Sequence, residues 1–337
     1  MVSRVFIDGA AGTTGLEIRE RLAGRRGLDV VQLSDSERKD PRARREALNE
    51  SDLVILCLPD EAAKEAVAMI ERNDVRVIDA STAHRTAPGW VYGFPEMEKD
   101  QRARIAASTR VANPGCYPTG YLALVRPLVR AGIIPPDFPL TVNAVSGYSG
   151  GGKSMIEEFE KKDSPAYTET VVRTYALTLA HKHLPEMKVH AGTTHPPVFA
   201  PSVGRYYRGM IVEVPLQLWA LPGKPNVFDV YKVLGEAYRG EKLVQVASFD
   251  RVMDVKEAVK SGRTVQPFDI GEFMPSKSID AEMLNLTNGM ELFVFGNDKT
   301  QQARLVAVLD NLGKGASGAA VQNMNIMLGL PETEGLV

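Results

Sequence analysis

The sequence holds few cysteines, no long hydrophobic run and almost no net charge. Two cysteines in 337 residues cannot form a disulfide scaffold, so we expect a reducing compartment, the cytoplasm. No stretch approaches the roughly 20 apolar residues of a membrane helix, and the first residues, MVSRVFIDGA, lack the pattern of a signal peptide. The 40 Lys and Arg residues against 42 Asp and Glu leave a formal charge of −2, which argues against nucleic acid as a partner.

What is present is typical of a globular protein. Hydrophobic residues make up 44% of the chain and charged residues 24%, close to the average for folded domains. The length predicts two domains, or one interrupted by another.

The first third alternates strand and helix patterns. Strands are expected over 5–8, 29–33, 53–58 and 75–79, and helices over 13–23 and 61–72. The run LVILCL at Leu53–Leu58 is typical of a strand buried on both faces. Strand–helix–strand repetition predicts a parallel sheet with right-handed crossovers.

The pattern changes near Asn113, where Pro, Gly and Cys cluster in NPGCYPTG before a helix expected over 121–131. Further strands are expected over 141–145, 172–178, 209–216 and 291–295, with a hairpin over 293–308. Further helices are expected over 227–239, 255–260 and 316–328. This mixture predicts a second domain of different architecture.

A glycine-rich turn, GAAGTTG, follows the first strand and opens the first helix. Gly9, Gly12 and Gly15 let the backbone approach a pyrophosphate, and the helix start at Thr13 and Thr14 offers free N–H groups. This position favours a dinucleotide site, and a tight turn without a ligand is the alternative.

The residues after the second strand suggest which dinucleotide binds. An acid about 20 residues after the turn grips a ribose 2′-hydroxyl in NAD sites, and Asp35 stands there. Ser34, Arg38 and Lys39 surround it, and a hydroxyl with two cations suits a 2′-phosphate. We therefore expect NADP.

A second motif competes for a phosphate role. Gly147–Ser154, GYSGGGKS, matches the GxxxxGKS phosphate loop of nucleotide-hydrolysing proteins and kinases. No apolar run ending in Asp follows at a helpful distance to hold magnesium, since Leu305–Asp310 is far downstream. The loop could instead cradle a substrate phosphate, or be a flexible glycine-rich turn.

Cys116 lies just before a predicted helix. The positive end of the helix dipole would lower the pKa of its thiol below about 8.5, which is how a nucleophilic cysteine is activated. Simple burial is the alternative. Cys57, inside LVILCL, is expected to be an inert core residue.

His181 and His183 are candidates to take the proton of the cysteine. On an extended strand only one of the two would face the site, because alternate side chains point to opposite faces. No Cys, Asp or Glu has suggestive spacing for a metal site. His84, His190 and His195 are expected to be surface or satisfied histidines.

Taken together, several motifs resemble those of the N-acetyl-γ-glutamyl-phosphate reductases, in particular the shorter, second-type branch. They are GAAGTTG, STAHR at Ser81–Arg85, YGFPE at Tyr92–Glu96, ANPGCYPTG, SGYSGGGKS, HKHLPEM and the terminal VQNMNIMLGLPE. The resemblance spans nearly the whole chain. It implies the fold of semialdehyde dehydrogenases and glyceraldehyde-phosphate dehydrogenase, an α/β fold in which a Rossmann domain is interrupted by an α+β catalytic domain.

The resemblance implies residues 1–115 plus 316–337 as the NADP-binding domain and 116–315 as the catalytic and oligomerisation domain. It also implies NADPH-dependent reduction of N-acetyl-γ-glutamyl phosphate to N-acetylglutamate 5-semialdehyde, with release of phosphate, in a homodimer or homotetramer. The reaction would pass through a thioester on the cysteine.

The candidate residues follow from the motifs and the resemblance together. Those expected to act in catalysis are Cys116, His181 and His183. Those expected at the cofactor are Gly9, Gly12, Thr13, Thr14, Gly15, Ser34, Arg38, Lys39, Ser81 and Asn323. Those expected at the substrate phosphate are Arg85, Arg110, Gly150, Gly151, Lys153 and Ser154.

Two departures from the family pattern and three rival functions stay open. Ser202 stands where many members carry histidine, and His84 replaces an aspartate of the SADFR form of STAHR. The rivals are a reductase of aspartyl or carrier-linked aminoadipyl phosphate, a phosphate-loop ATPase or kinase, and a cofactor-binding regulator without catalysis.

Overall fold

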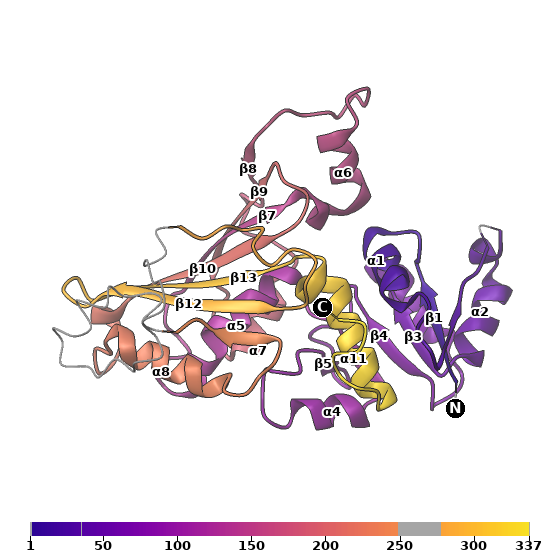
Figure 1. Cartoon of the computed structure of the whole chain (residues 1–337), viewed down its shortest axis with the longest axis horizontal. Coiled ribbons are helices and arrows are strands. Elements are labelled where there is room, and N and C mark those ends of the chain that lie inside the picture. The colour runs from indigo at the N-terminus through magenta and orange to yellow at the C-terminus, as the bar shows by residue number, and fades with distance from the viewer. Residues whose placement is uncertain (1, 35, 249–277, 337) are drawn as a thin grey trace.

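The computed structural model describes residues 2–34, 36–248 and 278–336, and it contains two β-sheets that lie side by side (Figure 1). Asp35 and the helix expected over 255–260 lie outside the described residues. Within these ranges no helix is long and apolar enough to cross a membrane.

The first sheet is parallel throughout, as predicted. Its six strands lie in the order β2-β1-β3-β4-β6-β5. Their bounds are β1 Ser3–Asp8, β2 Leu28–Val31, β3 Leu53–Leu56, β4 Arg76–Asp79, β5 Val91–Tyr92 and β6 Arg110–Ala112. β1 pairs with β2 on one side and β3 on the other, so the chain reverses its direction of travel across the sheet at β1. Ligands of such sheets bind outside the carboxyl ends of the strands at this point.

Helices cover both faces of this sheet. Val5 and Ile7 of β1 pack with α1 (Thr13–Leu22) and α11 (Gly318–Leu328), while Phe6 packs on the opposite face. The opposite face is covered by α2 (Pro41–Glu50) and α3 (Asp60–Ala68). Burial on both faces explains why all four residues of β3 are apolar.

The second sheet is mixed and has seven strands in the order β11-β12-β13-β10-β7-β9-β8. Their bounds are β7 Thr141–Gly147, β8 Val172–Thr174, β9 Val198–Gly204, β10 Met210–Gln217, β11 Val244–Val246, β12 Met290–Asn297 and β13 Gln302–Leu309. The predicted hairpin is confirmed as β12 and β13, which pair antiparallel along their whole length.

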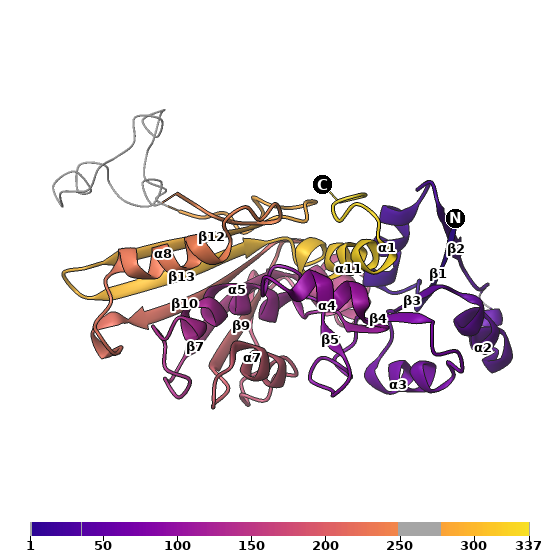
Figure 2. The same cartoon turned by 90° about the horizontal axis from the view of Figure 1, so that it is seen from below.

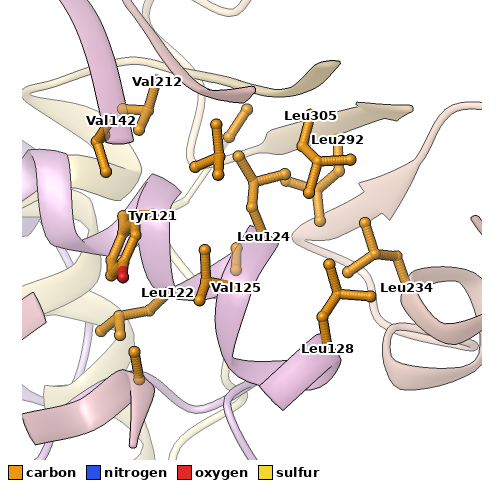
Figure 3. Packing of buried hydrophobic residues seen from close by; sticks show 14 of the residues in the cluster. Tyr121, Leu122, Leu124, Val125, Leu128, Val142, Val212, Leu234, Leu292 and Leu305 are labelled. Carbon is orange, nitrogen blue, oxygen red and sulfur yellow. The ribbon is translucent and has the colours of Figure 1, made fainter. Parts of the chain in front are cut away.

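The main core lies between this sheet and α5 (Cys116–Arg130). Tyr121, Leu124 and Leu128 of α5 belong to one buried cluster with Val212 and Leu305 of the sheet (Figure 3). Two further helices, α7 (Leu184–Ala191) and α8 (Val227–Ala237), pack against α5 (Figure 2). This packing fixes the start of α5, and therefore Cys116, against the sheet.

The chain crosses between the two sheets twice. It leaves the first sheet after β6 and returns through a π-helical turn, Gly313–Ser317, into α11. Arg208 ties the sheets together by ion pairs with Glu17 of α1 and with Asp310. The exact domain edges stay a prediction.

Several predicted bounds need correction. α5 begins at Cys116 and not at Tyr121, and the expected strand over 172–178 ends at Thr174. The sequence analysis did not foresee α4 (Gln101–Ala107) or the short edge strand β5.

Candidate active site

Cys116 is the first residue of α5, and the loop after β6 delivers it to the carboxyl edge of the first sheet. Gly115 is the N-cap and has no side chain to cap the helix. The thiol is partly exposed and lines a cavity of about 210 Å³. A nucleophile thus lies at a helix N-terminus with access to a ligand.

A buried carboxylate holds the loop that carries Cys116. Glu186 of α7 accepts hydrogen bonds from the Gly115 backbone N–H at 2.8 Å, the Tyr92 hydroxyl at 2.6 Å and Arg85 Nη1 at 3.0 Å. Arg85 also donates Nε to the Asn113 carbonyl and Nη2 to the Ala80 carbonyl, each at 3.0 Å. All three guanidinium nitrogens of Arg85 are therefore engaged by the protein, and this arginine mainly braces the site.

Both histidines border the same cavity as Cys116. They lie in a turn before α7, with ring centroids 4.7 Å apart, so this segment is not an extended strand and both imidazoles face the site. His183 is the deeper of the two. A Cβ on Gly115 would lie 2.7 Å from His183 Nε2 and 2.6 Å from Arg85 Nη1, so only glycine fits before the cysteine.

The pKa of the Cys116 thiol differs from the prediction, which was a lowered value. Burial raises the pKa of Cys116, although Arg85 and Lys182 oppose the shift, so the predicted net lowering by the helix end is wrong. Burial lowers the pKa of His181 to about 4 and that of His183 well below its ordinary value. Both imidazoles are therefore neutral at pH 7, the form that can accept the thiol proton.

The glycine turn after β1 has the shape that a pyrophosphate needs. Gly9 has a φ of +91°, and a Cβ there would lie 2.3 Å from the Cys57 carbonyl oxygen. A Cβ on Gly15 would lie 2.5 Å from the Gly9 oxygen. No side chain caps α1 at Gly12, so its first N–H groups stay available to an anion. These residues fit a dinucleotide.

Three adjoining cavities, together called the groove, lie between this turn and Cys116 and share lining residues. The cavity at Cys116 shares Thr13 and Thr14 with a cavity of about 280 Å³ along Gly12–Gly15. That cavity shares Lys153 with a third, of about 550 Å³, lined by Gly9, Ser34 and Arg38.

The other residues expected at the cofactor lie outside this groove. Lys39 lines none of the three cavities, and Ser81 is buried with its hydroxyl donated to Asp79 at 2.7 Å. Asn323 is fully buried and donates Nδ2 to the Gly93 carbonyl at 2.8 Å and to Asn113 Oδ1 at 3.1 Å. Ser81 and Asn323 support the loops around the site.

The loop Gly147–Ser154 uses half of its backbone N–H groups in hydrogen bonds within the protein. The backbone N–H groups of Gly147, Tyr148 and Ser149 donate to the carbonyls of Gly209, Tyr206 and Tyr207. The N–H of Gly152 donates to Ser149. These four N–H groups are therefore not available to a nucleotide phosphate.

The residues predicted at the substrate phosphate therefore separate. Gly150 lines the cavity at Cys116, but Gly151 and Ser154 do not. Lys153, on α6 (Gly152–Glu160), borders the dinucleotide cavities. Arg110 is corrected, since its guanidinium donates to the Val75 and Thr109 carbonyls near the start of β6, at the opposite edge of the sheet from Cys116.

Three residues of the site, Glu186, Tyr92 and Lys182, were not predicted from the sequence. Glu186 and Tyr92 belong to the motifs HKHLPEM and YGFPE, which were noticed without a role. Lys182 lies between the two histidines and lines the cavity at Cys116. The signal that could have pointed to these residues is their position within the motifs HKHLPEM and YGFPE.

The remaining cysteine and histidines take no part in this cavity. Cys57 is partly buried and packs against the core of the first sheet beside Gly12–Gly15. Burial raises the pKa of its thiol to about 12, which agrees with the expectation of an inert cysteine. His84 pairs with Asp79 at 2.6 Å, His190 pairs with the Arg85 carbonyl at 2.6 Å, and His195 is exposed. The expectation of surface or satisfied histidines is confirmed.

Two other expectations concern a metal and Ser202. In the described part of the chain, no three His, Cys, Asp or Glu residues cluster as a metal site would need. Ser202 shares a hydrogen bond with Thr174 at 3.1 Å and does not line the cavity at Cys116.

Comparison with known proteins identifies both halves of the chain. Residues 4–105 match the semialdehyde dehydrogenase NAD binding domain, and residues 116–270 match the semialdehyde dehydrogenase dimerisation domain. Solved structures with the same fold include a probable aspartate-semialdehyde dehydrogenase from Pseudomonas aeruginosa, with 15% identity and a TM-score of 0.69 over 97% of this chain and 99% of that one. Aspartate semialdehyde dehydrogenase II from Vibrio cholerae has 15% identity and a TM-score of 0.66 over 98% and 99%. The predicted fold class is confirmed.

Full-length relatives are much closer in sequence. A protein from Nostoc sp. named N-acetyl-gamma-glutamyl-phosphate reductase 2 is 50% identical over 99% of both chains. A protein from Brucella ovis named N-acetyl-gamma-glutamyl-phosphate reductase is 50% identical over 98% of this chain and all of its own. These relatives confirm the resemblance seen in the motifs, and the chain belongs to the N-acetyl-γ-glutamyl-phosphate reductase family.

Proposed function

We propose that the chain reduces N-acetyl-γ-glutamyl phosphate to N-acetylglutamate 5-semialdehyde, releasing phosphate, with NADPH as the reductant, in arginine biosynthesis. The observation that carries this proposal is the placement of Cys116. It lies at a helix N-terminus, beside two neutral imidazoles and at one end of a groove that begins at the glycine turn. An acyl-phosphate reductase needs this combination of nucleophile, proton carrier and cofactor groove.

The chain's own residues account for the proton and bond changes. His183 accepts the Cys116 proton, and the thiolate attacks the acyl carbon. A C–S bond forms, the C–O bond to phosphate breaks, and the imidazolium returns its proton to the departing phosphate. NADPH, when bound, supplies the hydride that reduces the thioester. The resulting thiohemiacetal oxyanion reforms the carbonyl, expels the Cys116 thiolate and releases the aldehyde, and the thiolate then regains a proton from solvent.

Residues of both predicted domains hold the cofactor in this proposal. The turn Gly9–Gly15 holds the pyrophosphate, and Ser34 and Arg38 hold the 2′-phosphate. Lys153 is reassigned from the substrate to the cofactor, because it borders the two cavities at the glycine turn and not the cavity at Cys116. We also propose the division into residues 1–115 plus 316–337 and 116–315.

The assembly and compartment complete the proposal. The match to a dimerisation domain points to a homo-oligomer, which we propose to be a dimer or tetramer. We propose the cytoplasm as its compartment.

Replacing Cys116 tests the function directly. We expect Cys116→Ala to abolish NADPH oxidation with the acyl phosphate while NADPH still binds, because the cofactor groove is built from other residues. The measurements are NADPH oxidation with the acyl phosphate, fluorescence titration of NADPH binding, and the reverse reaction with N-acetylglutamate semialdehyde, phosphate and either NADP or NAD. The reverse reaction also reports cofactor preference, and turnover that survives the substitution would refute the mechanism.

A further inference from the structure

The cavity at Cys116 has an unbalanced charge. Among the described residues that line it, none is Asp or Glu, and two carry a positive charge, Arg85 and Lys182. The charge of Arg85 is compensated by Glu186, which lies behind the cavity wall at 3.0 Å. Both histidines are neutral at pH 7. The ammonium group of Lys182 forms no ion pair with a described residue, and the acid on which its charge acts, Asp60, does not line this cavity.

Lys182 is free to meet a ligand. Its side chain is exposed and forms no hydrogen bond or ion pair within the described residues, unlike Arg85 with its three engaged nitrogens. It lies between His181 and His183, in the turn that brings both imidazoles to Cys116.

We propose that Lys182 binds the phosphate group of the acyl-phosphate substrate and of the phosphate released, an inference that rests on the proposed function. The phosphate is attached to the carbon that the Cys116 sulfur attacks, so it must lie beside this cysteine. Three carbons separate the acyl carbon from the α-carboxylate of the substrate. A flexible lysine supplies a point charge that can follow the phosphate from the acyl phosphate to the free product.

The proposal also provides a cation for the substrate phosphate, because most of the residues that the sequence predicted for this role lie elsewhere. Of the residues expected at the substrate phosphate, Arg110 lies at the far edge of the sheet, and Gly151 and Ser154 lie outside the cavity. Lys153 borders the cofactor cavities. Arg85 and Gly150 remain at the cavity, but all three guanidinium nitrogens of Arg85 are engaged by the protein. Lys182, which the sequence did not predict, is therefore the cation of this cavity that has no hydrogen-bond partner among the described residues.

The reverse reaction separates the two anionic parts of the substrate, because phosphate and the aldehyde are then added independently. In Lys182→Ala we expect the KM for inorganic phosphate to rise about 10- to 100-fold, the loss typical of a charged hydrogen bond. The KM for N-acetylglutamate semialdehyde should change less than about twofold. Lys182→Arg, which keeps the charge, should restore most of the phosphate affinity. Lys188→Ala provides a matched control, since Lys188 is an exposed lysine of α7 that does not line the cavity.

Each other outcome contradicts the inference. An unchanged KM for phosphate would show that Lys182 does not bind the phosphate. A rise in the KM for the aldehyde, alone or equal to the rise for phosphate, would show that Lys182 has no phosphate-specific role. If wild-type protein shows no phosphate-dependent reverse reaction, the proposed function itself fails, which is a distinguishable result.

A second measurement does not need turnover. Iodoacetamide alkylates Cys116, and peptide mass spectrometry follows that residue separately from Cys57. Phosphate should slow alkylation of the wild-type protein, and Lys182→Ala should need about 10- to 100-fold more phosphate for equal protection. Equal protection in both proteins would overturn the proposal even if the variant is inactive.

Discussion

His181 and His183 stand two residues apart but meet different surroundings. His183 is 6% exposed and lies against Gly115, next to the cysteine. His181 is more exposed, and because the segment is a turn, the two imidazoles do not point to opposite sides as they would on a strand. The Nδ1 atom of His181 accepts the His183 backbone N–H at 3.1 Å, so one imidazole helps to place the other. This geometry favours His183 as the proton carrier and His181 as its support.

Replacing the two histidines separately should therefore give unequal losses. We expect His183→Asn to reduce kcat by about 10²- to 10⁴-fold, the usual contribution of acid–base catalysis, and His181→Asn to reduce it less. Initial rates of NADPH oxidation measure both. Equal and mild losses would remove the acid–base role from this pair.

The same imidazoles make stability depend on pH. Their pKa values are lowered in the folded chain, to about 4 for His181, from 6.5 in the unfolded chain. The unfolded chain therefore binds more protons below pH 6.5, and their contribution to the free energy of unfolding is lost as pH falls from there toward 4. Urea denaturation at pH 7 and pH 5 should show a smaller difference for His183→Asn than for the wild-type protein.

At the scale of single elements, the starts of helices carry the binding functions. α1 begins at the glycine turn, α5 at Cys116 and α6 beside Lys153, and all three starts border the same groove. Helix N-termini offer unpaired N–H groups and partial positive charge, which suits a cofactor and a substrate that are both anionic.

Two glycines within helices allow a matched test of this idea. In Gly15→Ala the added Cβ would lie 2.5 Å from the Gly9 oxygen, so the turn must deform, and we expect the Kd for NADPH to rise at least about tenfold. Gly235→Ala in α8 meets nothing within 4 Å and should leave binding unchanged while stabilising the helix by about 1 kcal/mol. Fluorescence titration with NADPH and thermal melting measure the two effects. Equal binding by both variants would argue against the turn as the pyrophosphate site.

The elements that the sequence predicted best are those with strong local patterns. The buried strand LVIL and the turn GAAGTTG were recognised because each is visible in a short stretch of sequence, the strand as an apolar run and the turn as regularly spaced glycines. The start of α5 was missed because Pro118 and Gly120 look like helix breakers, although proline is tolerated in a first helical turn. The sequence left open whether the segment at His181 is extended, because nothing local distinguishes this turn from a strand.

The site was predicted less completely than the fold for a related reason. Cys116 and both histidines were found from residue type and motif. The placement of Lys153 depends on how α6 packs beside α1, and the role of Glu186 depends on a loop distant in sequence. A local sequence pattern does not show which distant segments will be in contact in the folded chain, so these two roles could not be predicted from it.

At the scale of the whole molecule, a buried ion pair secures the return of the chain to its first sheet. Lys314, just before α11, donates to both Glu96 carboxylate oxygens at 2.8 Å and to Gln322 at 2.7 Å. Lys314 is 1% exposed, and its ammonium also lies 5.4 Å from the centre of the Phe94 ring. The group joins the YGFPE segment to the C-terminal helix, so its loss should affect the entire fold.

Removing one partner of this pair should cost more than removing both. Lys314→Met leaves the Glu96 carboxylate buried without its cation, and we expect the free energy of unfolding to fall by about 3–5 kcal/mol. The double variant Glu96→Met with Lys314→Met should recover more than half of that loss. Lys64→Met is the control, since Lys64 pairs with Glu61 at the same 2.8 Å but on the surface, where the change should be about 0–1 kcal/mol. Urea unfolding curves compare all four proteins. If Lys314→Met is no more destabilising than Lys64→Met, this pair does not anchor α11, and the return of the chain is held by the apolar contacts of Val321 and Met324 instead.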